Sequence, residues 1–181
     1  MKLLSIGKAY GYQLGKKHKY KEGEMDQVDR VLFDLKENPF SRRIMTNIYV
    51  HEDLHEMNLY PCAYSMTFNV TGNRLNAILN QRSQDILAAK QLERGDVPDS
   101  RLMVCTGKGF EPGELVHVIA DAHIYDRHIP IVKELIQRPV YPAPKVTLNP
   151  EVKDFYKFTV DDFTIEDYEA GPQIKNIPIA I

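Results

Sequence analysis

A stretch of alternating residues, followed by a tight turn and a second apolar run, constrains the fold more than any other feature. From Cys62 to Val70 larger apolar residues alternate with small or polar ones, which is typical of a strand with one buried face. Thr71-Gly72-Asn73 separates this run from a second one, Leu75 to Asn80. We therefore expect an antiparallel hairpin that carries Gln81-Arg82-Ser83-Gln84-Asp85 at its far end. The face expected toward the core consists of Tyr64, Met66, Phe68 and Val70.

Four further segments carry a periodic pattern. Glu24 to Glu37 predicts an amphipathic helix that Asn38-Pro39 ends, and Ile44 to Val50 and Leu115 to Ala122 predict strands. Asp126 to Gln137 predicts a second helix, capped by its first residue and stopped by the prolines that follow it. The residues expected to face inward are Met25, Val28, Leu32 and Leu35 in the first helix and Ile129, Val132, Leu135 and Ile136 in the second.

Length and composition predict one globular domain spanning residues 1–181. Of the 181 residues, 43% are hydrophobic and 27% charged, enough to bury a core without metal or disulfide support. The net charge of -2 gives no basic excess for coating DNA or a membrane surface. No apolar run reaches the roughly 18 residues of a membrane span, and we expect no signal peptide from Met1 to Ile6, which is short and soon followed by polar residues. With only Cys62 and Cys105 available for a bridge, we expect a reducing cytoplasm.

Cys62 is a candidate nucleophile at the start of the first predicted strand. A free cysteine in such a place is more often inert core packing, because cysteine is among the most buried residue types. The functional interpretation requires a nearby cation, since the thiolate is the reactive form. Arg82 could supply it if the hairpin folds back beside the cysteine.

Three polar segments could also carry chemistry. His51-Glu52-Asp53-Leu54-His55 matches the zinc-hydrolase pattern HExxH, which needs an α-helix and a third ligand; the alternative is a solvated turn. Arg42-Arg43 is an exposed basic pair or an anion-binding pair. The segment Asp121 to His128 is a solvated turn or a sugar or phosphate site. Lys90 to Gly109 has no sustained periodicity, which is unusual between patterned segments.

Together these fragments resemble thymidylate synthase. The resemblance covers residues 7–89 and 110–181, and its motifs occur in the family's order at similar separations. They are Leu59-Tyr60-Pro61-Cys62, Gln81-Arg82-Ser83-Gln84-Asp85, Asp121-Ala122-His123-Ile124-Tyr125 and Pro178-Ile179-Ala180-Ile181.

The resemblance implies an α+β fold built on a large twisted mixed sheet flanked by helices, with two subunits packed sheet against sheet. It also implies the methylation of dUMP to dTMP, with 5,10-methylenetetrahydrofolate as co-substrate and no metal. Cys62 would add to C6 of the uracil ring, so that C5 can attack the methylene carbon of the folate. Hydride transfer from the folate would then give dTMP and dihydrofolate.

The family's nucleotide-binding roles carry over by motif. Arg82 and Ser83 would bind the phosphate, and Arg42-Arg43 would reach it from the partner subunit of a homodimer. His123 and Tyr125 would hold the deoxyribose hydroxyl. The dUMP site implied in this way comprises Arg42, Arg43, Arg82, Ser83, Gln84, Asp85, His123, Ile124 and Tyr125.

Other family roles concern the folate and proton transfer. Asp85 would bind the pterin, and its backbone would help to hold the uracil. Ala180 and the carboxylate of Ile181 would close over the folate and exclude water. Tyr10 would belong to the proton-transfer network, which makes Tyr10, Cys62 and Arg82 the expected catalytic set.

Parts of the family's pattern have no match. Gly7 to Gln13 resembles a segment that in the family follows a long stretch with a phosphate-binding arginine and a catalytic glutamate, neither of which has a counterpart. Lys90 to Gly109 stands where the family has an apolar helix preceded by a uracil-reading asparagine. We hypothesise two compensating frame shifts there; reading the codons in the alternate frame should recover that helix. Ala63 replaces the histidine that many members carry after the nucleophile.

Three alternatives stay open at this point. The chain could be an inactive remnant of the family that binds nucleotide or dimerises without turnover, because the glutamate that organises proton transfer is missing. A related enzyme that hydroxymethylates pyrimidine nucleotides shares much of the pattern. The zinc hydrolase suggested by His51 and His55 is the third.

Overall fold

The computed structural model describes residues 5–87 and 109–178 and divides the chain into two compact units. We call Met1–Ser83 together with Lys108–Asp121 the sheet unit, and Gln84–Gly107 together with Ala122–Ile181 the C-terminal unit. The expectation of a single domain stays a prediction. None of the helices in the described ranges is long and apolar enough to cross a membrane.

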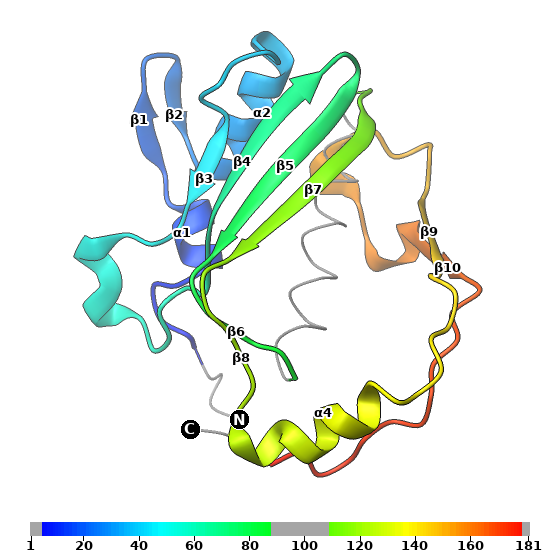
Figure 1. Cartoon of the computed structure of the whole chain (residues 1–181). Helices are drawn as coiled ribbons and strands as arrows, with labels where there is room; N and C mark the ends of the chain where they lie inside the picture. The colour runs from blue at the N-terminus through cyan, green and yellow to red at the C-terminus, as the bar shows by residue number, and fades with distance from the viewer. Residues whose placement is uncertain (1–4, 88–108, 179–181) are drawn as a thin grey trace. The chain divides into compact units, whose positions relative to one another are not determined.

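The sheet unit is built on a four-stranded mixed sheet in the order β3-β4-β5-β7 (Figure 1). Its strands are β3 (Met45–Asn47), β4 (Ala63–Thr71), β5 (Arg74–Gln81) and β7 (Glu111–Ile119). The first three are antiparallel, whereas β7 runs parallel to β5. Helices and a mixed sheet confirm the predicted α+β class.

The predicted hairpin is confirmed as β4 and β5. Thr71 pairs with Arg74, so the turn has the two central residues Gly72 and Asn73. Of these two, only Gly72 has a positive φ, 61°, as the first central position of a type II′ turn requires. The turn fixes the register of the β4–β5 pairs from Thr71–Arg74 to Ser65–Asn80.

The sheet has one core face and one open face. On the core face Phe68 pairs with Ala77 and Val70 with Leu75, and all four are buried. Hydrophobic burial of this kind is the main stabilising term of a domain.

The open face carries two rows of residues that cross all four strands. Paired positions in neighbouring strands point to the same side of a sheet. The first row is Met45, Thr67, Ile78 and Val116, and the second is Asn47, Ser65, Asn80 and Val118. Its most exposed apolar members are Met45, Val116 and Val118, each 48% exposed.

Helix α2 (Gln27–Glu37) packs its buried residues Val31 and Leu35 into the core of the sheet unit. The Asp26 side chain accepts a hydrogen bond from the Asp29 amide at 2.8 Å and so caps the helix. The predicted start at Glu24 is therefore wrong by three residues, because β2 (Gly23–Met25) pairs with β1 (His18–Tyr20) in a small hairpin. The predicted end at Asn38 is confirmed.

Strand β3 is shorter than the predicted strand from Ile44 to Val50. The Tyr49 amide donates to Asn47 Oδ1 at 3.1 Å, a local side-chain bond that turns the backbone out of the ladder. The chain then enters η1 (His51–Glu56), a 3₁₀ helix.

The short helix α1 (Gly11–Gly15) is joined to η1 by a polar cluster around Asp53. The Asp53 carboxylate accepts from Gln13 Nε2 at 3.0 Å, Lys16 Nζ at 2.8 Å and Lys8 Nζ at 3.3 Å. The Gln13 bond, followed by that of Lys16, holds the pKa of the Asp53 carboxyl well below its ordinary value. The carboxylate is therefore charged throughout the neutral range.

The C-terminal unit contains two small sheets and several short helices. Strand β6 (Gln84–Asp85) pairs parallel with β8 (Ala122–His123), and β9 (Lys145–Leu148) pairs antiparallel with β10 (Phe163–Glu166). The helices are η2 (Asp126–His128), α4 (Ile129–Leu135), η3 (Phe155–Lys157) and η4 (Val160–Asp162). Among the described residues of this unit only Gln84 and His128 are buried.

One prediction for this part of the chain is wrong, and a predicted strand of the sheet unit has shifted bounds. The single helix from Asp126 to Gln137 is divided into η2 and α4, and no side chain caps either one. Pro130 lies in the first turn of α4, where a missing N–H is tolerated. The expected inward face of α4 is largely open, since Ile136 is 75% exposed. The predicted strand Leu115 to Ala122 is β7, which ends at Ile119, with Ala122 in β8.

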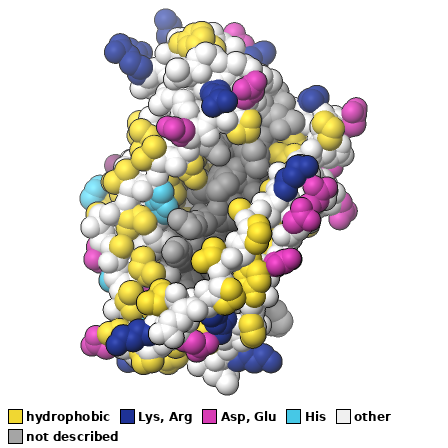
Figure 2. Space-filling view, turned by 45° about the vertical axis from the view of Figure 1, so that its right-hand side comes forward, with side chains coloured by type: hydrophobic (Ala, Val, Ile, Leu, Met, Phe, Trp, Pro, Cys, Tyr) yellow, Lys and Arg dark blue, Asp and Glu magenta, His cyan; other side chains and the backbone are white. Residues whose placement is uncertain are grey.

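Exposed apolar side chains are interspersed with charged ones on the surface drawn in Figure 2. Lysines and arginines lie among aspartates and glutamates there.

Truncation of Leu75 tests the core face of the sheet. Leu75 is fully buried, so Leu75→Ala should lower the free energy of unfolding by about 2–5 kcal/mol. The matched variant Leu59→Ala, at a position 55% exposed, should change it by less than about 1 kcal/mol. Urea denaturation measures both, and equal losses would contradict the assigned core.

The Asp53 cluster predicts a pH dependence of stability. A carboxyl with a lowered folded pKa adds stability above its ordinary pKa of about 3.9, and this is lost as the pH falls toward the lowered value. Asp53→Asn should therefore destabilise the protein most at pH 7 and progressively less below about pH 4. Urea denaturation of wild type and variant at pH 7 and below about pH 4 measures the loss of stability at each pH, and the exposed Glu37→Gln is the control. A pH-independent loss would refute the ion-pair account.

Candidate functional site

A β-bulge in β4 brings Cys62 opposite Arg82. The pairs from Ser65–Asn80 to Thr71–Arg74 keep one register, but Ala63 pairs with Gln81, which leaves Tyr64 as the extra residue. Extending this shifted register places Cys62 opposite Arg82, and the Arg82 amide donates to the Cys62 carbonyl at 2.9 Å. The proximity that the nucleophile hypothesis requires is therefore present.

The Arg82 guanidinium is fixed against the backbone before the cysteine. Its Nε donates to the Pro61 carbonyl at 3.0 Å and its Nη2 to the Tyr60 carbonyl at 2.9 Å. Nη2 also lies 3.8 Å from Cys62 Sγ. Arginine stays charged at all relevant pH values, so a permanent cation faces this half-buried thiol. Within the described residues the Arg82 Nη1 group has no hydrogen-bond partner, which leaves it available for an anion.

Tyr10 approaches the same cysteine from the N-terminal segment. Its hydroxyl accepts a hydrogen bond from the Cys62 amide at 3.0 Å. Tyr10 precedes α1 and has a φ of 42°, which is strained for a bulky residue. All three residues of the expected catalytic set, Cys62, Arg82 and Tyr10, thus lie together in the sheet unit.

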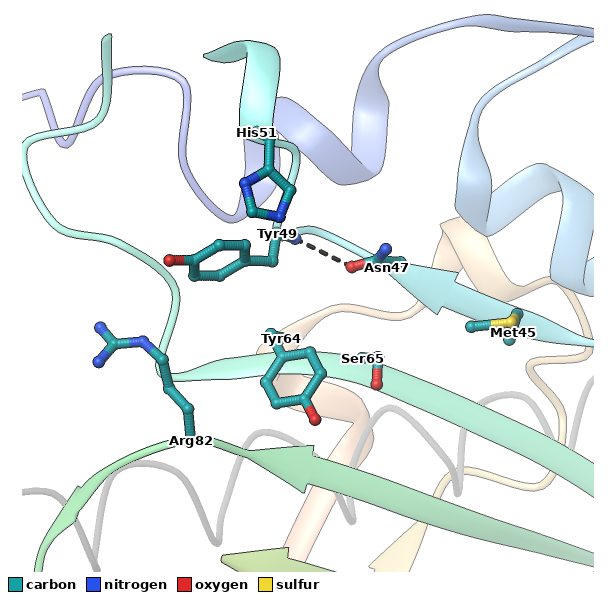
Figure 3. Close-up of a pocket in the computed structure, with 7 residues that line it drawn as sticks. All are labelled: Met45, Asn47, Tyr49, His51, Tyr64, Ser65 and Arg82. Atoms are coloured by element: carbon teal, nitrogen blue, oxygen red, sulfur yellow. Dashed lines mark hydrogen bonds between the residues drawn. The ribbon is translucent and has the colours of Figure 1, made fainter. Parts of the chain in front are cut away.

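A pocket of about 510 Å³ opens beside Arg82 (Figure 3). The Tyr49 and Tyr64 rings form part of its wall in an edge-to-face arrangement, with centroids 6.5 Å apart. Met45, Asn47 and Ser65 of the open sheet face line the rest of it, together with His51. The pocket therefore combines aromatic walls with a guanidinium, while Cys62 is not among its lining residues.

The remaining predicted phosphate ligands of the sheet unit lie in two places. Ser83 follows Arg82, and its carbonyl accepts from Gln81 Nε2 at 2.8 Å, which fixes the local backbone. Arg42 and Arg43 are exposed in the turn before β3 and, among the described residues, form no ion pair. The antiparallel register sets them about seven residues along the sheet from Cys62, roughly 20 Å away. They do not meet Cys62 within one chain.

The predicted ligands of the C-terminal unit also form a group. Asp85 and His123 are register partners in β6 and β8, so they lie side by side. The His123 and Tyr125 rings meet edge to face at 5.1 Å between centroids. Gln84 is buried, whereas Ile124 is exposed.

His128 is a residue of this group to which the sequence analysis gave no role. It is 1% exposed, its Nε2 lies 2.8 Å from the Pro178 carbonyl, and its Nδ1 lies 3.7 Å from Asp85 Oδ2. Its ring also meets that of Tyr125 at 5.8 Å. A histidine at the end of the polar run Asp121 to His128 was the available signal, but it did not indicate burial.

The zinc-hydrolase interpretation lacks its geometry. His51 and His55 lie in the 3₁₀ helix η1, where three residues make a turn, so positions four apart do not share a face. Among residues 5–87 and 109–178, no cluster of three His, Cys, Asp or Glu side chains could hold a metal ion. The middle residue of the motif, Asp53, is instead the one that is buried and bonded.

Several expectations fall on residues outside the described ranges. These are the folate-closing roles of Ala180 and Ile181, the second cysteine Cys105, and the non-matching segment Lys90 to Gly109 except for its last residue.

Comparison with known proteins gives a consistent result. The family model described as thymidylate synthase matches residues 2–180. The thymidylate synthases of Bacillus subtilis subsp. natto and of Bacillus phage phi3T are each 40% identical over 171 residues, covering 94% of this chain and 61% of the relative. That of Bacillus atrophaeus is 39% identical, with 75% of its length covered.

A solved structure matches as well. The thermostable thymidylate synthase A from Bacillus subtilis superposes with a TM-score of 0.91 at 37% identity, covering 96% of this chain and 63% of that one. The chain thus spans about three-fifths of the length of the first relatives it matches. The register at Cys62 and Arg82 and these matches lead to one conclusion: the chain belongs to the thymidylate synthase family.

Proposed function

We propose that this protein is a thymidylate synthase that methylates dUMP to dTMP, with 5,10-methylenetetrahydrofolate as carbon donor and reductant. The observation that carries the proposal is the contact between the Arg82 guanidinium and Cys62 Sγ at 3.8 Å in a member of this family. The free thiol of Cys62 fits a reducing cytoplasm, where dTMP synthesis would take place.

In this proposal Cys62 is the nucleophile. Its thiolate adds to C6 of the uracil ring, and the electron density gained at C5 lets that carbon attack the methylene group of the co-substrate. Loss of the C5 proton, hydride transfer from the folate and release of Cys62 then give dTMP and dihydrofolate. Arg82 stabilises the sulfur charge, and Tyr10 holds the Cys62 amide while its hydroxyl joins the proton-transfer network.

The nucleotide phosphate would bind at the far side of the Arg82 guanidinium. Nη2 is occupied by the Tyr60 carbonyl, so Nη1 is the donor left for a phosphate oxygen, and Ser83 follows in the chain to add its hydroxyl. Arg82 would thus serve both the thiolate and the phosphate.

The family's roles for the sugar, the base and the folate fall on Gln84, Asp85 and the residues from His123 onward. His123 and Tyr125 hold the deoxyribose hydroxyl, and Asp85, between His123 and His128, holds the pterin. Gln84 and Ile124 complete the dUMP set, and Ala180 and Ile181 would close over the folate.

We also propose that the protein acts as a homodimer through the open face of its sheet. That face has exposed apolar side chains at Met45, Val116 and Val118 in two continuous rows. A second copy would cover them, as an isologous interface requires. Arg42 and Arg43 lie roughly 20 Å along the sheet from their own Cys62, so they fit a role in the partner subunit's phosphate site.

Covalent trapping tests the proposed reaction. Incubation with 5-fluoro-dUMP and methylenetetrahydrofolate should add one equivalent of both ligands to the wild-type mass, and Cys62→Ala should abolish the adduct. Arg82→Lys should slow trapping roughly 10- to 100-fold, because lysine cannot keep the bonds to the Pro61 and Tyr60 carbonyls while it also faces Cys62 Sγ and the phosphate. The exposed Arg74→Lys is the matched control and should trap normally. Folded wild-type protein that binds dUMP without an adduct would instead favour an inactive remnant.

The open face predicts a concentration-dependent dimer. Val118→Glu would place a charge in the desolvated interface and should shift sedimentation toward the monomer. Val140→Glu, at a position 97% exposed in the C-terminal unit, should leave the dimer intact. A wild-type protein that sediments as a monomer at micromolar concentrations would refute this assembly.

A further inference from the structure

We propose that Asp53 is a positioning residue for Cys62: it holds the turn at Tyr10 in place, and the Tyr10 hydroxyl in turn fixes the Cys62 amide. The structural part of this proposal stands on contacts alone. Its catalytic consequence rests on the proposed thymidylate synthase function.

Helix α1 is joined to η1 through Asp53. The helix has five residues, no side-chain cap, and Gln13 as its single buried member. A helix this short is not stable by itself, so its position is set by tertiary contacts. Gln13 Nε2 donates to Asp53 Oδ2 at 3.0 Å and to the Lys8 carbonyl at 2.9 Å. Its amide is therefore the link between α1 and η1.

The turn that Asp53 supports is strained. Tyr10 precedes α1 with a φ of 42°, a conformation that persists only where the surroundings determine it. Lys8 lies two residues before Tyr10 and Lys16 follows the end of α1, and both lysines donate to the same carboxylate. Asp53 thus holds the chain on both sides of Tyr10.

The segment before the turn lies directly on η1. The Lys8 amide donates to the Glu56 carbonyl at 3.0 Å, and Gly7 forms a β-bridge with Met57. A Cβ at Gly7 would collide with the Glu56 carbonyl oxygen, so only glycine permits this approach. Neutral backbone contacts therefore position Gly7 and the Lys8 backbone before the turn, while the charge of Asp53 holds the side chains that flank Tyr10.

Both η1 and α1 are connected to Cys62, the proposed nucleophile. From η1 the chain continues directly through Met57 to Pro61 into Cys62, and from α1 the Tyr10 hydroxyl reaches the Cys62 amide at 3.0 Å. Gln27 adds a brace, since its side chain bonds the Gln13 carbonyl and the Asn47 backbone on β3. A change at Asp53 should therefore reach Cys62 without any contact between the two residues.

Amide hydrogen exchange at Cys62 tests the link directly, with no need for catalysis. Asp53→Asn should speed exchange of the Cys62 amide about five- to tenfold, as Tyr10→Phe should, because Tyr10→Phe removes the hydrogen bond to that amide and Asp53→Asn releases the turn that holds the Tyr10 hydroxyl in place. The double variant should be no faster than Tyr10→Phe alone. Glu22→Gln, which breaks the ion pair with Arg30 elsewhere in the sheet unit, should leave Cys62 unchanged.

The rate of covalent trapping tests the catalytic consequence, independently of amide exchange. Asp53→Asn should slow formation of the 5-fluoro-dUMP adduct roughly tenfold while the Kd for dUMP changes less than twofold, and Asp53→Glu should restore part of the rate. Unchanged exchange at Cys62 in folded Asp53→Asn would overturn the positioning role, whatever the trapping result. If Asp53→Asn does not fold, Lys16→Met replaces it and must accelerate the same exchange. Absence of a wild-type adduct would count only against the proposed function.

Discussion

The register of the β4–β5 hairpin is the constraint on which the rest of the sheet unit depends. A two-residue turn at Gly72 and Asn73 sets it, and side chains alternate between faces with a period of two. The same register therefore puts Phe68 and Leu75 into the core and Thr67 on the open face. Only at Tyr64 does it change, by one residue, and that change makes Arg82 rather than Ser83 the partner of Cys62.

The end of the sheet near Cys62 is held by polar contacts as well as by packing. Gln13, Gln27 and Gln81 are buried there and bonded to backbone or to neighbouring side chains, beside the buried side chains of Ala9 and Pro61. Directional bonds fix positions more narrowly than apolar packing, and each buried polar group must be paired to be tolerated. This suits a site where a thiol, a guanidinium and a hydroxyl must keep set distances.

The sequence predicts those features that depend on local chemistry. The alternation around Phe68, the turn at Gly72 and the helix end at Asn38 were all readable, because each is fixed by neighbouring residues. The bulge at Tyr64 was not, since nothing in that residue distinguishes it from its strand neighbours. The apolar periodicity begins before Asp26, so it predicted a helix from Glu24, whereas the Asp26 cap starts the helix at Gln27.

The HExxH motif shows that chemistry which depends on distant contacts cannot be taken from motif spacing alone. The pattern directs attention to His51 and His55, yet an α-helical spacing has no meaning in a 3₁₀ helix. Asp53 is significant because Gln13 and Lys16, some forty residues earlier, converge on it. Motif spacing therefore indicates chemistry only after the local helix type is known, and the charged residue with the most distant partners is the better guide to how this site is held in place.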